Sequence, residues 1–472
     1  MTRPSMLEHG IHLGYFDPAR GHVPNPGMGL QGYAFSDHMH YAFSQDEWKH
    51  TERTNPNREL PRPVLDRMLD LPYVDNVYFR IDWNRVQTQP GKLALPKEWE
   101  WMMEAVEARG KRWSFRVMNS SRHSPGGDSI PEFLTDKLEV HDYANEYEFG
   151  PVRKRYPAYT SEYLKWWREL MSLFAEKYDS HPLLEFVDVS GFGIWGEGHH
   201  YGKHDADQIV NRYPDGSDEA VATLLADHLD VFRQTPVAMT LHLLDFEAGV
   251  AALQNGDVWM RRDSIQPFTS TIEWGAMADR VPGRATIWET IVPSWSNERA
   301  PLFHTDRTPQ RFLDFSAHYA AIGFNPWDVI IAHEQRIGLY EQLAPRLGYR
   351  LRPSIVWRRV VEGGQELVVA LANDGTVDVP GAITLTATFA DGQTSSCELE
   401  VGHPHPGDRT LYRLSIPESM HDRGSEVSVD LSLEVRIRGK RSPVRWAVAE
   451  IGRDPFVLSL PLRMPRSGRA HV

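Results

Sequence analysis

Hydrophobic and polar positions follow two alternating patterns between residue 30 and about residue 335. Short apolar runs rich in β-branched and aromatic residues predict strands, and longer runs with apolar residues three or four positions apart predict helices. The predicted strands are residues 29–35, 76–82, 112–118, 186–194, 237–243, 257–262, 285–289 and 328–332. The predicted helices include residues 97–109, 162–178, 218–233 and 308–322.

Eight strands that alternate with helices are typical of a (β/α)8 TIM barrel, an α/β fold. The alternative is an open, doubly wound parallel sheet. That architecture often places a glycine-rich phosphate loop after its first strand, and the sequence has none there. We therefore predict a barrel over residues 1–347.

The pattern changes after Leu347-Gly348-Tyr349, where short strand-like runs follow one another without helices. These runs are residues 350–361, 366–373, 383–389, 395–401, 409–416, 427–437 and 445–451. Turn sequences such as Asp374-Gly375 separate them, which predicts an antiparallel β-sandwich over residues 348–472. No linker rich in glycine, serine or proline divides the two domains, so we expect rigid packing. The sandwich is expected to cover one side of the barrel or to support a homo-oligomer.

Composition narrows the range of partners. The chain has 64 acidic and 51 basic residues and a formal net charge of −13, which argues against a nucleic-acid surface and an anionic membrane. The N-terminal sequence lacks the apolar core of a secretory signal, and no apolar run is long enough to span a membrane. With Cys397 as its single cysteine, the chain has no intrachain disulfide. We expect a cytoplasmic protein.

Two glutamates stand at the ends of predicted barrel strands, where functional side chains of TIM barrels lie. Glu197 follows the fourth strand in Trp195-Gly196-Glu197, and Glu289 ends the seventh. Hydrolysis of a glycosidic bond needs two carboxyl groups that flank it, and strands four and seven face each other across a barrel mouth. We predict Glu197 and Glu289 as the catalytic pair. The side chains expected to bind substrate lie at the same end: Arg80, Trp83, Asn119, Trp195, His199, His242, Asp263, Trp288 and Glu334.

The glutamates on strands four and seven resemble those of the clan A retaining glycoside hydrolases. The segment FRIDW at 79–83, with Pro90-Gly91 after it, is similar to the strand-two region of that clan. NPGMG at 25–29, GIWGE at 193–197 and GYR at 348–350 resemble a bacterial barrel-plus-sandwich family that carries a domain of unknown function. One position departs from clan A. Its members place asparagine before the strand-four glutamate to bind the sugar 2-hydroxyl, whereas this chain has Gly196, with Asn119 as the nearest candidate for that role.

The resemblance implies a retaining and exo-acting enzyme on oligosaccharides or small glycosides. Glu289 would attack the anomeric carbon while Glu197 protonates the leaving oxygen, and Glu197 would then deprotonate the incoming water. Such an acid must keep its proton near neutral pH, so its pKa is expected to be raised. Retention needs carboxyl groups about 5 Å apart and inversion about 6.5–9.5 Å, so the stereochemistry stays open at the level of sequence. Carbohydrate is the expected partner, and neither an organic cofactor nor a metal is expected.

Plainer interpretations compete with each assignment. Glu197 could be a structural carboxylate, Arg80 could form a buried ion pair or position a catalytic carboxylate, and barrel tryptophans are more often core than sugar platforms. The loop His199–Asp205 carries histidines that invite a metal site, although its glycines argue for an irregular loop. Two other functions therefore remain open: a carbohydrate-binding barrel without catalysis, and a metal-dependent enzyme that uses this loop.

Overall fold

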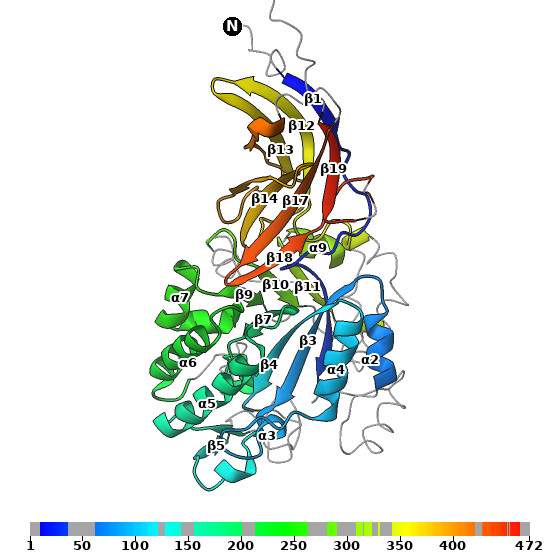
Figure 1. Cartoon of the computed structure of the whole chain (residues 1–472). Coiled ribbons are helices and arrows are strands. Elements are labelled where there is room, and N and C mark those ends of the chain that lie inside the picture. Colours follow the sequence, from blue (N-terminus) through cyan, green and yellow to red (C-terminus); the bar gives the residue numbers. More distant parts are fainter. Residues whose placement is uncertain are drawn as a thin grey trace, which may run out of the picture.

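The computed structural model describes residues 10–35, 62–120, 128–142, 155–200, 213–262, 281–289, 308–314, 316–322, 329–330, 342–420, 427–450, 452 and 454–462. Within these residues the chain forms a barrel, two antiparallel sheets of a sandwich beside it and a small antiparallel sheet of β5 Val140–Asp142 with β6 Arg155–Pro157 (Figure 1). None of the helices in the described ranges is long and apolar enough to cross a membrane.

Eight parallel strands close into a barrel in the order β10-β11-β2-β3-β4-β7-β8-β9. Their bounds are β2 Gly29–Phe35, β3 Val74–Asp82, β4 Arg112–Met118, β7 Leu184–Asp188, β8 Val237–Thr240, β9 Trp259–Arg262, β10 Thr286–Glu289 and β11 Tyr319–Ile322. Connecting helices are α2 Arg62–Leu69, α3 Trp83–Val86, α4 Lys97–Ala108, α5 Ser161–Tyr178, α6 Ser217–Val231, α7 Glu247–Gln254 and α9 Thr308–Asp314. The prediction of a TIM barrel is confirmed.

The eighth strand lies earlier in the chain than predicted. It is β11 at Tyr319–Ile322, inside the segment assigned to a helix, whereas Val329 and Ile330 in the predicted strand are helical. The helix stops at Asp314, and Ser316 then takes a φ of 50°, which turns the chain out of the helix. The apolar run therefore continues across a break in structure that its hydrophobic pattern does not mark. The fourth and fifth strands also end earlier than predicted, at Asp188 and Thr240.

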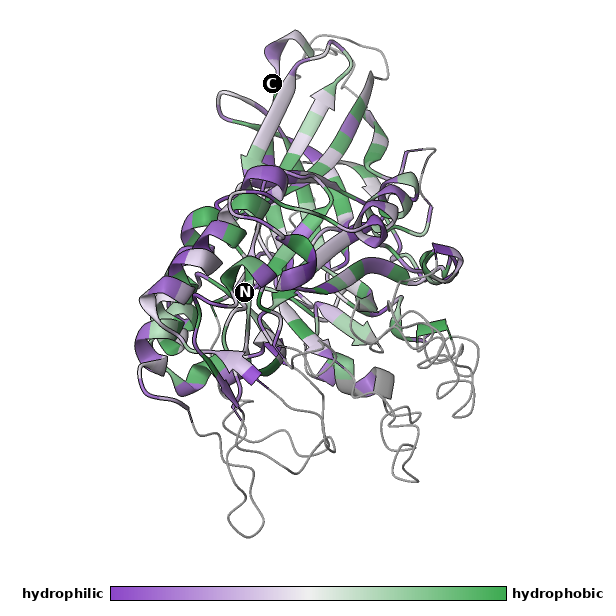
Figure 2. Ribbon diagram, turned by 90° about the horizontal axis from the view of Figure 1, so that it is seen from below, coloured by the Kyte–Doolittle hydropathy of each residue, from purple (hydrophilic) through white to green (hydrophobic). Residues whose placement is uncertain are grey.

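Successive side chains of the strands point alternately into the barrel and toward the helices, as the pleat requires. In β3, Tyr78 and Arg80 point inward, whereas Phe79 and Ile81 belong to the outer core. That outer core is aromatic where α4 and α5 meet the strands: the Trp99 ring lies 5.8 Å from Trp113 and 5.6 Å from Phe115, in edge-to-face geometry. In Figure 2 the helices carry hydrophobic and hydrophilic residues side by side along their length. Their apolar faces fix the barrel strands from outside.

The sandwich has a four-stranded sheet in the order β1-β12-β13-β16 and a sheet with the order β15-β14-β17-β18, in which β19 also pairs with β17. The bounds are β1 Gly10–Tyr15, β12 Leu351–Val361, β13 Gly364–Asn373, β14 Ala382–Phe389, β15 Thr394–Glu398, β16 Arg409–Ile416, β17 Val427–Ile437, β18 Lys440–Val444 and β19 Val457–Leu462. The prediction of a sandwich is confirmed, but its last strand is misplaced. Two strands, β18 and β19, flank residues 445–451, and β1 joins the sandwich from before the barrel.

The sandwich covers the N-terminal ends of the barrel strands. Lys440 of β18 donates to the carbonyl oxygen of Leu184 at the start of β7, at 2.9 Å. Asp378 accepts a hydrogen bond from the backbone of Gly283, just before β10. One hydrophobic core extends from the barrel interior at this end into both sheets of the sandwich. Figure 1 shows the two sheets of the sandwich at this end of the barrel. The C-terminal ends of the strands, where a TIM barrel carries its chemistry, are therefore at the opposite end of the barrel.

Candidate active site

The turn that carries Glu197 is built from backbone conformations that favour glycine. Gly193 has a φ of 77° and Gly196 a φ of 71°, and Trp195 between them also lies in the left-handed region at 55°. A side chain on Gly193 would place its Cβ 2.6 Å from the backbone nitrogen of His199. The close approach lets the turn fold back on itself, with the Ile194 amide donating to the His199 carbonyl at 3.1 Å. This compact turn directs Glu197 into the barrel.

Glu197 is held by two arginines from neighbouring strands. Its Oε1 accepts hydrogen bonds from Nη1 of Arg80 and from Nη1 of Arg116, each at 2.7 Å. Arg80 and Arg116 are direct partners in the pairing of β3 with β4, so the carboxylate lies between two cations side by side. Its other oxygen, Oε2, lies 4.0 Å from Nδ1 of His199. Two guanidinium groups stabilise the ionised form of Glu197, which is the opposite of what a resting general acid requires.

Glu289 reaches the same interior from the other side of the barrel. Its Oε2 accepts a hydrogen bond from Nη2 of Arg261 at 2.7 Å. The same Nη2 contacts the hydroxyl of Tyr33, and the Arg261 guanidinium lies 4.1 Å above the centre of the Tyr78 ring. Glu289 is completely shielded from solvent at 0% exposure, and Glu197 nearly so at 3%.

Asp188, the last residue of β7, lies between the two glutamates. Its Oδ2 accepts from Nη2 of Arg116 at 2.8 Å and lies 3.5 Å from Nη1 of Arg261. The hydroxyl of Tyr78 donates to the same oxygen. We call the six buried charged residues of this network the barrel ion cluster: Arg80, Arg116, Asp188, Glu197, Arg261 and Glu289.

The cluster balances three cationic against three anionic side chains, all at most 3% exposed. Burial lowers the pKa of Arg116, but the Tyr78 hydroxyl and the nearby carboxylates outweigh burial, so the pKa lies above its ordinary value. Burial likewise lowers the pKa of Arg261, while Tyr33, Tyr78 and the carboxylates raise it well above that value. Burial raises the pKa of both tyrosines well above the ordinary value. The arginines are therefore charged and the tyrosines neutral.

Solved structures with a partly similar fold are glycoside hydrolases. The catalytic domain of a β-amylase from Paenibacillus polymyxa is 12% identical with a TM-score of 0.41, and the match covers 66% of this chain and 98% of that one. PbGH5A, a glycoside hydrolase family 5 enzyme from Prevotella bryantii B14, is 10% identical with a TM-score of 0.42, covering 67% of this chain and 96% of that one. No family model and no curated protein matches the sequence.

The predicted tryptophans do not share one location. Trp83 is fully buried outside the barrel, where its Nε1 donates to Gln87 at 2.8 Å and its ring lies 5.1 Å from Trp167. Trp288 is also fully buried and packs in the outer core. Both therefore lie in the core of the structure. Trp195, by contrast, is partly exposed, and its ring lies 5.8 Å from that of His199.

His199, His242 and Asn119 gather around the Glu197 turn. The His199 and His242 rings lie 4.9 Å apart, and His199 is the one that faces Glu197. Asn119, which follows β4, is fully buried, and its Oδ1 would lie 3.5 Å from a Cβ placed on Gly196. The structure thus brings Arg80, Asn119, Trp195, His199 and His242 together around Glu197.

Two predicted substrate-binding residues, Asp263 and Glu334, lie outside the described residues, as do His204 and Asp205 of the histidine-rich loop. Of that loop, His200 is described, and its Nε2 lies 2.8 Å from the hydroxyl of Tyr159. Burial lowers the pKa of His200 to about 3, so it is neutral. Within the described ranges, no group of three or more histidine, cysteine or acidic side chains is arranged to hold a metal.

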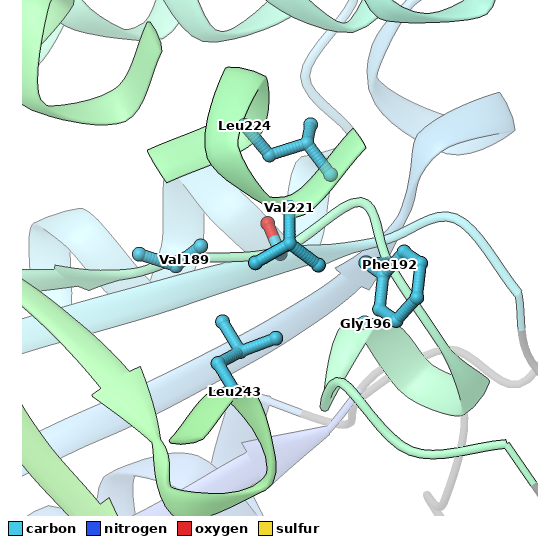
Figure 3. A pocket seen from close by; sticks show the side chains of 7 residues that line it. Val189, Phe192, Gly196, Val221, Leu224 and Leu243 are labelled. Carbon is cyan, nitrogen blue, oxygen red and sulfur yellow. The ribbon is translucent and has the colours of Figure 1, made fainter. Parts of the chain in front are cut away.

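An apolar cavity lies behind the Glu197 turn, between that turn, α6 and the 3-10 segment Leu241–Asp245 (Figure 3). Its volume is about 10 Å³, roughly the room that one water molecule needs. Its walls are formed by Val189, Ser190, Phe192, Gly196, Val221, Leu224 and Leu243. Ser190 supplies the single polar side chain among them, so the cavity lacks the hydrogen-bonding groups that a sugar ring needs.

Of the four charged residues that surround the two glutamates, Arg80 is among the residues predicted from the sequence. Arg116, Asp188 and Arg261 are not. Each lies within or at the end of a strand and not in a loop. The available signal was parity: Arg116 lies two residues after Ser114, so both point to one face of a strand whose other face carries Phe115. A charged residue on the inward face of a barrel strand indicates that its side chain has a charged partner in the barrel interior, as Arg116 does.

Proposed function

We propose that this protein is a glycoside hydrolase that cleaves oligosaccharides or small glycosides with Glu197 and Glu289. One observation carries the proposal: the turn after β7 and the end of β10 direct two glutamates into the same barrel interior, where a shared network of arginines connects them. A paired set of carboxyl groups at this end of a TIM barrel is what glycoside hydrolysis requires.

An exo-acting mode fits the depth of the pair. At 3% and 0% exposure, Glu197 and Glu289 lie inside the barrel and not along an open surface. A chain end or a small glycoside can enter such a site after side chains above it move aside, whereas the middle of a polymer needs an open cleft.

Two assignments of roles give different expectations. The resemblance to clan A makes Glu289 the nucleophile and Glu197 the acid and base. The contacts favour the reverse, because Glu197 binds two guanidinium groups and Glu289 binds one. An ionised carboxylate suits the nucleophile, and the partner with fewer cations gains a proton more easily.

The test is turnover of a panel of aryl glycosides by the wild type and by Glu197→Gln and Glu289→Gln. Each variant should lose at least about 100-fold in kcat/KM, since general acid–base catalysis contributes roughly 10²–10⁴ in rate. Glu98→Gln is the matched control, because Glu98 is also buried and paired with an arginine but lies on α4 outside the barrel. No turnover of any glycoside by the wild type, or full turnover by both variants, would contradict the proposal.

Azide rescue of Glu197→Ala and Glu289→Ala then assigns the roles. In a retaining enzyme, azide replaces the missing nucleophile on one face of the sugar, or the activated water on the other. The rescued nucleophile variant should release a glycosyl azide of inverted configuration, and the rescued acid/base variant one of retained configuration. Failure of azide to rescue either variant favours inversion.

The buried ion pairs of the cluster favour a second function, a carbohydrate-binding barrel without catalysis. Each glutamate contacts an arginine and lies out of solvent, as expected of structural ion pairs. Calorimetric binding of a glycoside that the wild type leaves intact would support this function and exclude hydrolysis of that compound.

A further inference from the structure

We propose that Asp188 is a positioning residue that couples the ionisation of Glu197 to that of Glu289 through Arg116 and Arg261. This inference rests on the proposed function, since it concerns the same carboxylate pair. Asp188 contacts neither glutamate in the described structure, so its effect on them passes through the two arginines.

The chain of contacts alternates in charge from one glutamate to the other. Nη1 of Arg116 binds Glu197 at 2.7 Å while its Nη2 binds Asp188 at 2.8 Å. Nη1 of Arg261 lies 3.5 Å from Asp188 while its Nη2 binds Glu289 at 2.7 Å. Each guanidinium thus divides its charge between Asp188 and one glutamate. Arg116 holds both of its partners by hydrogen bonds, whereas Arg261 hydrogen-bonds Glu289 and acts on Asp188 through its charge, so a change of charge at one end alters the other.

Two other groups, Tyr78 and His228, face Asp188 from neighbouring elements. The Tyr78 hydroxyl of β3 donates to Oδ2. Nε of Arg116 adds a hydrogen bond to the same oxygen at 3.2 Å. His228 of α6 interacts with Asp188 from outside the barrel, and burial lowers the pKa of His228 to about 4, so it is neutral. Asp188 therefore lies among two neutral groups and two cations.

Glu197 and Glu289 have further neighbours that do not supply the coupling. Arg80 and His199 face Glu197, with His242 behind His199. Tyr33 faces Glu289 together with Arg261. None of these groups contacts both ends of the chain, so Asp188 with its two arginines forms the continuous connection among the described residues.

The first measurement is the pH dependence of kcat/KM for Asp188→Asn. Asparagine keeps the size of aspartate but removes a negative charge, so both arginines act more strongly on the glutamates. The acidic limb of the profile should move down by about one pH unit, since a nearby charge shifts a carboxyl by roughly that much or more. Asp227→Asn is the matched control: Asp227 is a buried aspartate paired with Arg168, but on α6 outside the barrel. An unmoved profile in Asp188→Asn overturns the proposal.

A second measurement needs no turnover, so the inference is tested even where the proposed hydrolysis fails. The nitrogen–proton NMR signal of the Arg261 Nε–H group reports the far end of the chain. Glu197→Gln should shift this signal although Glu197 does not contact Arg261, and the shift should vanish when Asp188→Asn is added. If the chemical shift of the Arg261 signal is the same in Glu197→Gln as in the wild type, the coupling is refuted. This variant alone provides the test even where Asp188→Asn does not fold.

Discussion

Lys440 of the sandwich binds the N-terminal end of the barrel through a buried amino group, and burial disfavours the charge of that group. Its Nζ donates to the carbonyl oxygens of His181 and Leu184, at 3.0 Å and 2.9 Å. Burial lowers the pKa of Lys440 to about 8, against the opposing effect of Asp179 and Glu185. A neutral amine still donates two hydrogen bonds, so the contact does not require the charge.

The consequence for stability follows from the proton that Lys440 releases on folding. In the unfolded chain its pKa is near 10.5, so between pH 8 and pH 10.5 the unfolded state binds more protons than the folded state. Stability from this group therefore rises with pH through that window and is lowest below pH 8. At about 1.4 kcal/mol per unit of pKa, the full change is about 3 kcal/mol.

The assay compares the wild type with Lys440→Met by urea unfolding, followed by tryptophan fluorescence, at a series of pH values. The difference in free energy of unfolding between the two proteins should shift in favour of the wild type by about 3 kcal/mol as the pH rises through this window. Lys165→Met is the control, because Lys165 is 70% exposed on α5. A difference that stays constant with pH, or moves the other way, refutes the reasoning.

Two further predictions concern a histidine pair and the glycines of the Glu197 turn. His22 Nε2 lies 2.8 Å from Asp75 Oδ1, and although burial lowers the pKa of His22, Asp75 outweighs burial and raises it above 6.5. The stabilisation that protonated His22 gives is thus fully present below pH 6.5 and is lost as the pH rises through the raised pKa. His22→Gln should therefore lower the urea midpoint more in acid than at about pH 8. An equal loss at both pH values contradicts this prediction. Gly193→Ala should cost more stability than Gly216→Ala and abolish turnover, because both have positive φ but only Gly193 would push its Cβ to 2.6 Å from backbone. Gly216→Ala should cost about 1–2 kcal/mol in the same unfolding assay, and equal losses in the two variants would contradict the steric argument.

Local pattern was sufficient for most of the barrel. The strand Arg112–Met118 was predicted at its observed bounds, because its β-rich run follows directly on the end of an amphipathic helix. The pattern failed where one apolar run contains two elements, as between Asp314 and Tyr319, because the helix ends and the strand begins within a few residues without a marked change in hydrophobicity. It also gave no signal for β1, whose partner β12 is more than three hundred residues away.

The site was predictable at its ends but not at its centre. Glu289 ends β10 and Glu197 lies in the turn that follows β7, and the barrel fold marks both of these places in advance. Asp188 and Arg261 form an ion pair between two strands that come together only when the barrel closes. No local sequence pattern indicates that the two residues are close. The predicted location of two tryptophans lacked a local signal for a related reason. Trp83 and Trp288 alternate with the inward-pointing residues of β3 and β10 and so face the outer core, and this is clear only once Tyr78 and Glu289 are known to point inward.

The glycine before Glu197 follows from the geometry of the turn. Gly196 has a φ of 71°, and a Cβ there would lie 3.1 Å from the Cβ of Ser190. An asparagine, as clan A carries at this position, tolerates a positive φ better than most side chains, but its Cβ would require Ser190 to move by a few tenths of an ångström. The turn that places Glu197 between Arg80 and Arg116 therefore favours glycine at this position. Under the proposed function, Asn119, which follows β4 and borders Gly196, is the amide expected to bind a sugar hydroxyl in place of the clan A asparagine.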